Sequence, residues 1–308
     1  MPVFAYGDTT STIIGGKAAN QHLSSFFVAG DAPTITGSGR GGNDYVEGVF
    51  AYGDAQTLSG HARGGDDDVV THTPGTDDWF RSVGVGDALT MSGHARGGDD
   101  ILIATGGVDY SSGFNSVDNE LVGDGFTMSG RTRGGNDTLY GANSLRNVMY
   151  GDGWEMYDHA RGGDDILVAG GSGSLANFMY GDAVWMADGT RGGDDILISG
   201  ASYDLMYGDH SSSREEIGFE PTSAIGGHDT FVFMPNNGDD IIGDFHHGED
   251  KIDLRAFGFS GFNDLHITVL SDGSSVIDLG SGSVHVMDVV LLQMGIEQTP
   301  LTAGDFIF

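Results

Sequence analysis

The sequence predicts an all-β chain that folds as a right-handed parallel β-roll or β-helix, a solenoid with a capping β region at its C-terminal end. Three observations predict this fold. An aspartate is followed nine positions later by a basic residue seven times, from Asp8/Lys17 to Asp182/Arg191. Glycine makes up 54 of the 308 residues without the three-residue period of collagen. Apolar residues recur at fixed places in each copy. Similar segments repeated along a chain are typical of solenoids, in which each unit packs on its neighbours.

Each repeat divides into three nonapeptides, most clearly in residues 182–208. The first contains an apolar Leu or Met, the second reads RGG(D/N)D and then carries an apolar residue, and the third ends in Tyr-Gly-Asp. Alternation of apolar and polar residues between turn signals predicts strands rather than helices. The positions expected to face inward are Leu58, Met91, Met128, Met156 and Met186, then Val46, Val69, Leu102, Leu139, Leu167 and Leu197, and finally Met149 and Met179.

The distance between copies varies, but the step from aspartate to arginine does not. All the extra residues follow the RGGDD strand, at 70–84 and 103–120 and in shorter insertions around Asn143–Arg146 and Ser172–Asn177. Such insertions map to loops on one face of a solenoid, often the binding face. We favour one repeat per coil of three strands, which keeps the constant step on one face. The alternative, a two-strand coil of about 18 residues, would move it between opposite faces.

Three regions follow from the change in composition along the chain. Residues 1–210 carry the repeat, residues 211–220 form a polar linker, and residues 221–308 contain mixed hydrophobic strands. The last region keeps the Gly-Asp signature in GGHDTFVF and GDDIIGDF.

The composition excludes several classes of protein. A formal net charge of −32 argues against a nucleic-acid-binding protein. The absence of cysteine excludes disulfides and thiolate metal sites. No stretch is apolar enough for a membrane span, and the first residues show no Sec signal peptide. A charge this large repels itself in a compact state, which bound multivalent cations would relieve.

The repeated aspartates are candidate ligands for Ca²⁺. Stacked Gly-rich turns bring carboxylates and carbonyl oxygens of neighbouring coils together, and Ca²⁺ prefers such oxygen ligands. The alternative is a ladder of solvated turns, because aspartate also stabilises turns through its own backbone. The candidate metal ligands are Asp44, Asp54, Asp67, Asp87, Asp100, Asp124, Asp137, Asp152, Asp165, Asp182, Asp195, Asp209, Asp229 and Asp240.

The segments GGNDTLYG, GGDDILVAG and GGDDILISG resemble the calcium-binding nonapeptide of the RTX (repeat-in-toxin) family. Residues 226–265 are similar to the C-terminal domain of serralysin-type RTX proteins, and the ending LTAGDFIF resembles their type I secretion signal. The serralysin zinc motif is missing. The resemblance implies a β-roll that binds Ca²⁺ in its turns, passes through the type I secretion machinery and folds in extracellular calcium. It therefore implies a secreted protein.

The basic residues of the repeat are the second group of candidates. The six repeated arginines are expected to stack as a ladder: Arg40, Arg63, Arg96, Arg133, Arg161 and Arg191. They either pair with aspartates of neighbouring coils or bind the carboxylate or sulfate groups of an acidic polysaccharide. Candidate catalytic residues for a polysaccharide lyase are His61, His94, His159, Arg96 and Arg133, although an active site needs a unique set of residues rather than a repeated one.

The inserted loops supply the remaining candidates. The residues expected to contact a ligand are Trp79, Arg81, Tyr110, Phe114 and Arg146, whereas Trp154 and Trp185 are expected to be structural. Two functions remain open at this point. The first is a secreted calcium-binding protein that binds extracellular acidic polysaccharide. The second is an enzyme, a uronate lyase or glycoside hydrolase, with its site on the loop or Arg/His face.

Overall fold

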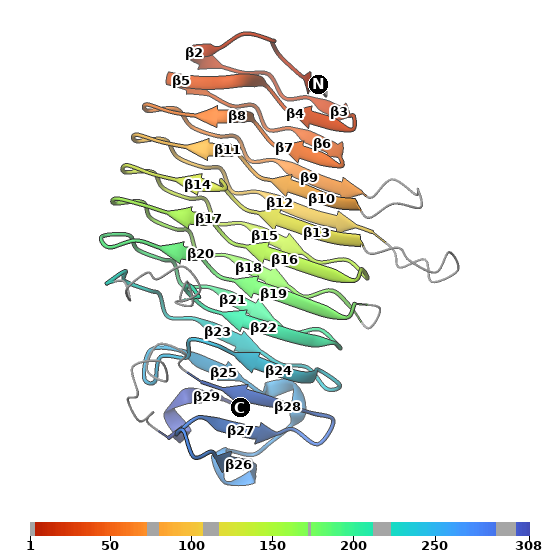
Figure 1. Ribbon diagram of the computed structural model, residues 1–308, viewed down its shortest axis with the longest axis vertical. Helices are drawn as coiled ribbons and strands as arrows, with labels where there is room; N and C mark the ends of the chain where they lie inside the picture. The colour runs from red at the N-terminus through yellow and green to blue at the C-terminus, as the bar shows by residue number, and fades with distance from the viewer. Residues whose placement is uncertain (1–3, 73–79, 107–116, 172–173, 212–222, 288–299) are drawn as a thin grey trace.

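The computed structural model describes residues 4–72, 80–106, 117–171, 174–211, 223–287 and 300–308, and its strands form three long sheets (Figure 1). Through the repeat region each coil contributes one strand to each sheet, so that equivalent residues of successive copies are register partners. Within these residues the pairings between strands are parallel, except among three strands near the C-terminal end. The predicted parallel solenoid with three strands per coil is confirmed.

The strands of the three sheets are as follows. Sheet A has 12 strands, in the order β1 (Ala5–Tyr6), β4 (Phe27–Ala29), β7 (Phe50–Tyr52), β10 (Phe80–Val85), β13 (Val117–Val122), β16 (Arg146–Tyr150), β19 (Ala176–Tyr180), β22 (Tyr203–Tyr207), β24 (Gly238–Ile242), β28 (Gly282–Val286), β27 (Ser275–Asp278) and β26 (His266–Val269). Sheet B has seven, β2 (Ile13–Lys17), β5 (Ala32–Arg40), β8 (Ala55–Leu58), β11 (Ala88–Met91), β14 (Thr127–Met128), β17 (Gly153–Met156) and β20 (Ala183–Met186). Sheet C has ten, β3 (His22–Ser24), β6 (Tyr45–Gly48), β9 (Asp68–His72), β12 (Ile101–Thr105), β15 (Thr138–Tyr140), β18 (Ile166–Val168), β21 (Ile196–Ile198), β23 (Thr230–Val232), β25 (Lys251–Asp253) and β29 (Phe306–Ile307).

Two of the three buried hydrophobic clusters among the described residues form the cores inside the solenoid, and the third contains Tyr52, Val83 and Tyr150. Sheets A and C enclose the first, which contains the inward residues of the second and third nonapeptides, such as Leu102 and Met149. Sheet B and the segment that returns from it enclose the second, with Met91, Met128 and Ala95. All 13 positions that the repeat predicts to face inward are fully buried. The alternation of apolar and polar residues therefore predicted the core correctly.

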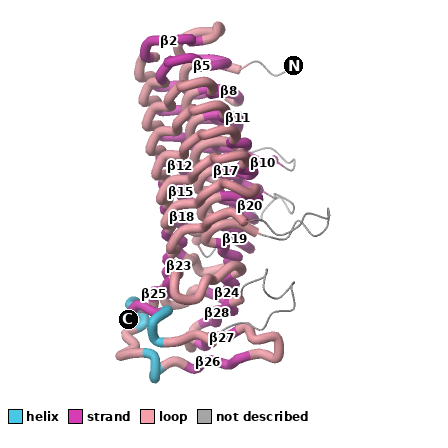
Figure 2. The backbone as a smooth tube through the Cα atoms, turned by 90° about the vertical axis from the view of Figure 1, so that its left-hand side faces the viewer, coloured by secondary structure: helices cyan, strands magenta, loops and turns pink. Residues whose placement is uncertain are grey.

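Sheets A and C continue beyond the repeat, whereas sheet B ends at β20. Strands β23, β24, β25 and β29 extend the two sheets, and the antiparallel strands β26, β27 and β28 close the C-terminal end (Figure 2). Three short 3₁₀ helices, η3 (Arg255–Phe257), η4 (Phe262–Asp264) and η5 (Ala303–Asp305), lie in this part. The region predicted for 221–308 thus adds to the same two sheets. Apart from Ser211, the predicted linker lies outside the described residues.

A ladder of buried polar side chains also runs through sheet A. Ser82 donates to Asn119 at 2.7 Å, and Asn119 donates to Asn147 at 3.0 Å. Asn147 donates to Asn177 at 2.7 Å, and Asn177 donates to Asp204 at 2.6 Å. Each side chain donates a hydrogen bond to the equivalent side chain of the next coil. The ladder therefore fixes the register between coils without leaving these buried amides unpaired.

The second glycine of RGGDD is required by the close approach of neighbouring coils. A β-carbon on Gly98 would lie 1.5 Å from the carbonyl oxygen of Gly65. Because that atom belongs to the backbone, the coils would have to separate. We expect Gly98→Ala to destabilise the protein by more than about 4 kcal/mol in urea unfolding. Gly304→Ala is the control, since its β-carbon meets nothing closer than 3.6 Å. Equal stability of the two variants would contradict this packing.

Candidate metal column and cationic edge

Two rows of buried aspartates form a column between the two hydrophobic cores. One row follows the Gly-Asp step and the other is the second acidic residue of RGGDD. No member is more than 5% exposed. The Gly-Asp row contains Asp31, Asp54, Asp87, Asp124, Asp152, Asp182, Asp209 and Asp244, and the RGGDD row contains Asp44, Asp67, Asp100, Asp137, Asp165, Asp195, Asp229 and Asp250.

Backbone amides hold the Gly-Asp row in place. The carboxylate of Asp152 accepts a hydrogen bond of 2.9 Å from the N–H of Gly163, eleven residues later, and the same bond recurs from Asp31 to Asp182. Neighbouring carboxylates of this row come close together. A β-carbon on Gly134 would lie 2.1 Å from Asp152 Oδ1 and 2.2 Å from Asp124 Oδ2.

The RGGDD row links each coil to the next. The backbone N–H of Asp67 donates to Oδ1 of Asp100 at 2.6 Å, and the same bond recurs along the whole row. From Asp44 to Asp229, the second oxygen of each carboxylate is buried and has no hydrogen-bond partner within the described residues. Asp67 Oδ2 lies near a carbonyl oxygen instead. A β-carbon on Gly53 would lie 2.2 Å from Asp67 Oδ2 and 1.8 Å from the carbonyl oxygen of Gly86.

Burial and the proximity of other acids raise the pKa values of Asp137 and Asp44, two members of the column. Loss of solvent is the largest cause at Asp137, followed by the charges of Asp124, Asp100 and Asp165, and the pKa lies well above its usual value. Asp44, near one end of the column, has a pKa raised to about 7 by loss of solvent and then by the charge of Asp31. Ionised, the column therefore requires positive charge within it.

The donor set fits a hard divalent cation. Ca²⁺ takes carboxylate and carbonyl oxygens together, and each coil offers two aspartates beside glycine carbonyls. Within the described residues, no group of three or more His, Cys, Asp or Glu side chains forms a compact metal cluster. Any ion in the column would therefore depend on backbone carbonyls as well as side chains. The column contains sixteen carboxylates, so their number is half the size of the net charge of −32.

A histidine meets the column at its C-terminal end. His246 Nδ1 lies 3.4 Å from Asp209 Oδ2 and 4.0 Å from Asp250 Oδ2. The hydrogen bond to Asp209 is the largest cause that raises the pKa of His246 to about 10, and the charges of Asp244, Asp209 and Asp250 add to it. His246 is therefore protonated at neutral pH and supplies one positive charge at this end.

The structure brings together thirteen of the fourteen aspartates predicted as metal ligands. Asp240 is the exception, since it lies on β24 and bonds to Asn237 and to the backbone of Asp204. Sequence reasoning missed Asp31, Asp244 and Asp250. Asp31 follows a Gly-Asp step like the others, so that signal was available. Asp250 lacks the RGGDD motif and was not detectable from the repeat.

The six repeated arginines form an exposed ladder along the return segment. Each is paired in parallel with the arginine of the next coil, from Arg40 to Arg191, and Lys17 extends the ladder beside Arg40. Within the described residues, none of the six forms an ion pair or a side-chain hydrogen bond with a carboxylate. Pairing with aspartates of neighbouring coils, one of the two sequence-based alternatives, is therefore not observed.

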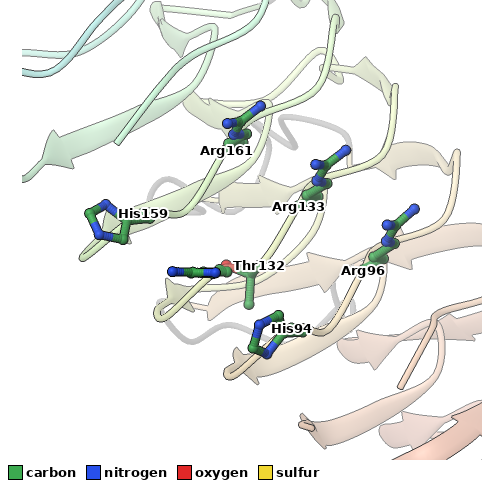
Figure 3. A pocket seen from close by; sticks show the side chains of 7 residues that line it. His94, Arg96, Thr132, Arg133, His159 and Arg161 are labelled. Carbon is green, nitrogen blue, oxygen red and sulfur yellow. The ribbon is translucent and has the colours of Figure 1, made fainter. Parts of the chain in front are cut away.

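A cavity of about 420 Å³ lies on this edge. Thr132 and six basic residues line it, namely His94, Arg96, Arg131, Arg133, His159 and Arg161. Figure 3 shows Arg96, Arg133 and Arg161 in one row, with His94 and His159 in a second row at the turns. Arg131 lies between the two histidines. Its backbone N–H donates to the carbonyl of Gly93, next to His94, and the backbone N–H of His159 donates to the carbonyl of Gly130, next to Arg131. Four of the five candidate catalytic residues meet here. The fifth, His61, stacks on His94 at 4.8 Å between ring centroids.

The candidate ligand residues of the loops have mixed outcomes. Trp79, Tyr110 and Phe114 lie outside the described residues. Arg81 and Arg146 line a second cavity of about 330 Å³, on the outer face of sheet A. Trp154, expected to be structural, is 40% exposed and lines that cavity, so this expectation is wrong. Trp185 is buried, as expected.

No helix among the described residues is long and apolar enough to cross a membrane, in keeping with the sequence. Eight of the 13 basic residues belong to the edge defined by Lys17, the six stacked arginines and Arg131, which we call the cationic edge. The molecule thus combines a buried acidic column with an exposed basic edge. Comparison of the chain with protein-family models, curated proteins and solved structures finds no match.

Proposed function

We propose that this chain is a secreted, calcium-stabilised solenoid of the RTX type that binds acidic polysaccharide along its cationic edge. The observation that carries the calcium part is the row of buried, unpartnered carboxylate oxygens from Asp44 to Asp229. An ionised carboxylate in such a place is costly unless a cation or a proton neutralises it. Asp54, Asp67, Asp87, Asp100 and their counterparts in other coils would hold Ca²⁺, which supplies that charge.

Metal binding of this kind is coupled to folding. At the low calcium concentration of a cytosol the column repels itself and the chain stays unfolded, as type I export requires. In millimolar extracellular calcium the coils assemble. The resemblance of the repeats and of the C-terminal residues to RTX proteins supports this route.

The cationic edge supports the polysaccharide part of the proposal. Exposed arginines in register repel one another, and because the described residues place no carboxylate partner against them, their guanidinium groups are available to a ligand. An extended polymer with regularly spaced anionic groups matches a straight row of forked donors. Nucleic acid is disfavoured because the remainder of the molecule is strongly acidic. An acidic polysaccharide, with fewer charges along its length, meets less repulsion.

Substitution of one edge arginine tests this binding. We expect Arg133→Gln to weaken binding of uronate hexasaccharides about tenfold in millimolar Ca²⁺, since a charge-assisted hydrogen bond contributes roughly 1.5–3 kcal/mol. The triple variant Arg96→Gln/Arg133→Gln/Arg161→Gln should lose binding altogether. Calorimetric titration with sulfated and unsulfated hexasaccharides measures both, and added salt should weaken the wild-type complex.

Arg255→Gln is the matched control, because it removes the same charge from an exposed residue already paired with Asp253. It should bind as the wild type does. Full affinity in the triple variant, or no binding of either hexasaccharide by the wild-type protein, would refute the polysaccharide part without touching the calcium part.

The cavity of the cationic edge also favours a second candidate function, uronate β-elimination. An arginine would neutralise the uronate carboxylate, and one neutral histidine, His94 or His159, would take the C5 proton. The C5–H electrons form the C4–C5 double bond while the C4–O bond breaks, and the other histidine, protonated, gives its proton to the leaving oxygen. Ultraviolet absorbance of the new double bond tests this. Its absence after prolonged incubation leaves binding as the function.

A further inference from the structure

The second cavity, on the outer face of sheet A, departs from the repeat. At the register position of Glu120 the neighbouring coils carry Val83 and Val148. The Glu120 side chain is nonetheless 4% exposed, so a charged group has replaced an apolar one in a buried place. Asp118 lies in register between Arg81 and Arg146 of the two neighbouring coils, and the coil after Arg146 carries Ala176 at this position. A cluster of residues that the repeat does not dictate is what a specific site requires.

The charges in this cavity are already matched. Arg146 forks onto Asp118, with Nε 3.0 Å from Oδ1 and a second contact from Nη2 to Oδ2. Arg81 pairs with Glu120, and the hydroxyl of Tyr150 donates to the same carboxylate at 3.4 Å. Two arginines thus face two carboxylates, and the cavity has no net charge. In this it differs from the cavity of the cationic edge, where no acid is present.

Aromatic rings form the other walls. Trp154 projects from β17 at the side of sheet B and is 40% exposed, while Phe178 and Tyr180 line the cavity from β19. Tyr150 packs against Tyr180 at 5.5 Å between ring centroids, which holds this wall in place. Exposed aromatic rings beside fixed polar groups are a pattern of small-molecule sites rather than of a closed core.

We propose that this cavity binds an uncharged pyranose unit of an oligosaccharide. One face of a pyranose presents C–H groups, which suit the Trp154 and Phe178 rings, and hydroxyls surround its edge. The two Arg–carboxylate pairs offer donors and acceptors side by side, so a hydroxyl that gives one hydrogen bond and accepts another is satisfied by each pair. The charge of an acidic sugar gains little here, because both arginines are already paired with carboxylates. The cavity volume of about 330 Å³ falls within the range of small-ligand sites.

The test uses the full chain in millimolar Ca²⁺ and a panel of neutral hexasaccharides of glucose, mannose, galactose and xylose in their common linkages. Saturation-transfer NMR should detect binding of at least one of them. Trp154→Ala should reduce its affinity at least tenfold. Tyr140→Ala, which removes an equally exposed ring from sheet C, should leave it unchanged. Circular dichroism confirms that both variants fold.

Two further observations separate this site from the cationic edge. Binding should persist at high salt, because no net charge attracts the ligand, and it should persist in the Arg96→Gln/Arg133→Gln/Arg161→Gln variant. Loss of neutral-sugar binding in that variant, no binding by any neutral hexasaccharide, or full binding by Trp154→Ala would each overturn the proposal. None of these outcomes bears on whether acidic polymers bind the edge.

Discussion

Removal of calcium with a chelator at pH 7.5 is expected to unfold the solenoid. The β signal in far-ultraviolet circular dichroism should fall, and added Ca²⁺ should restore it. Mg²⁺ should restore it poorly, because that smaller ion demands regular octahedral geometry and gives up its water reluctantly. The expectation follows from sixteen carboxylates that are at most 5% exposed and have few positive groups near them.

The size of the effect follows from a single member of the column. Burial raises the pKa of Asp250 to about 6 from an ordinary 3.8, despite hydrogen bonds from the backbone N–H groups of His246 and Asp229. Each pKa unit corresponds to about 1.4 kcal/mol, so ionised Asp250 costs on the order of 3 kcal/mol. Since a folded domain is typically stable by only about 5–15 kcal/mol, a few such residues exceed its whole stability.

A matched pair of variants locates the effect in the column. Asp100→Asn/Asp137→Asn/Asp165→Asn removes three buried charges, and we expect it to remain partly folded in chelator and to gain less from Ca²⁺. Asp66→Asn/Asp99→Asn/Asp164→Asn removes three exposed acids from the same turns and should behave as the wild type. A chelated wild-type protein with an unchanged spectrum would contradict calcium-coupled folding.

Acid is expected to stabilise the chelated protein, the reverse of ordinary acid denaturation. The pKa values of Asp250, Asp44 and Asp240 are raised to about 6, 7 and 8, all chiefly by loss of solvent, so the folded state binds protons more tightly than the unfolded chain. This contribution to stability is fully present below about pH 4 and is lost as the pH rises through these values. His246, with its pKa raised to about 10, acts in the same direction.

Thermal unfolding between pH 4 and pH 8 checks this prediction. In chelator the unfolding temperature should fall as the pH rises, until no folded protein remains near pH 7.5. In millimolar Ca²⁺ the slope should reverse, because protons then compete with the cation for the same carboxylates. A chelated protein that is most stable at neutral pH would show that the aspartates are neutralised in some other way.

The sequence predicted the features that depend on position within the repeat. The inward residues Leu102 and Met149, the stacked arginines and the stacking of the second acid of RGGDD from coil to coil all follow from strand alternation and a constant register. These are local properties, and copies that repeat them reinforce the pattern. The same regularity predicted that the variable length lies between sheets C and A.

The remaining features depend on which residues become neighbours across coils. Counting back from the Gly-Asp step gives the register of Asp118 with Arg146, but the insertions do not repeat their residues, so the repeat does not predict which side chains fill these positions. Glu120 appears in the sequence as one more acid in an insertion, yet it is buried beside Arg81 and Tyr150. The exposure of Trp154 was missed for a related reason, since residues beside core methionines usually belong to the packed interior.

The metal content of the purified protein tests the central claim most directly. After dialysis against micromolar Ca²⁺ and removal of free ions, elemental analysis of the wild-type protein should find several Ca²⁺ per chain. The Asp100→Asn/Asp137→Asn/Asp165→Asn variant should retain clearly fewer, and the Asp66→Asn/Asp99→Asn/Asp164→Asn variant should retain as many as the wild type. A wild-type protein with no more calcium than the dialysis buffer, or an equal loss in both variants, would contradict a calcium-filled carboxylate column.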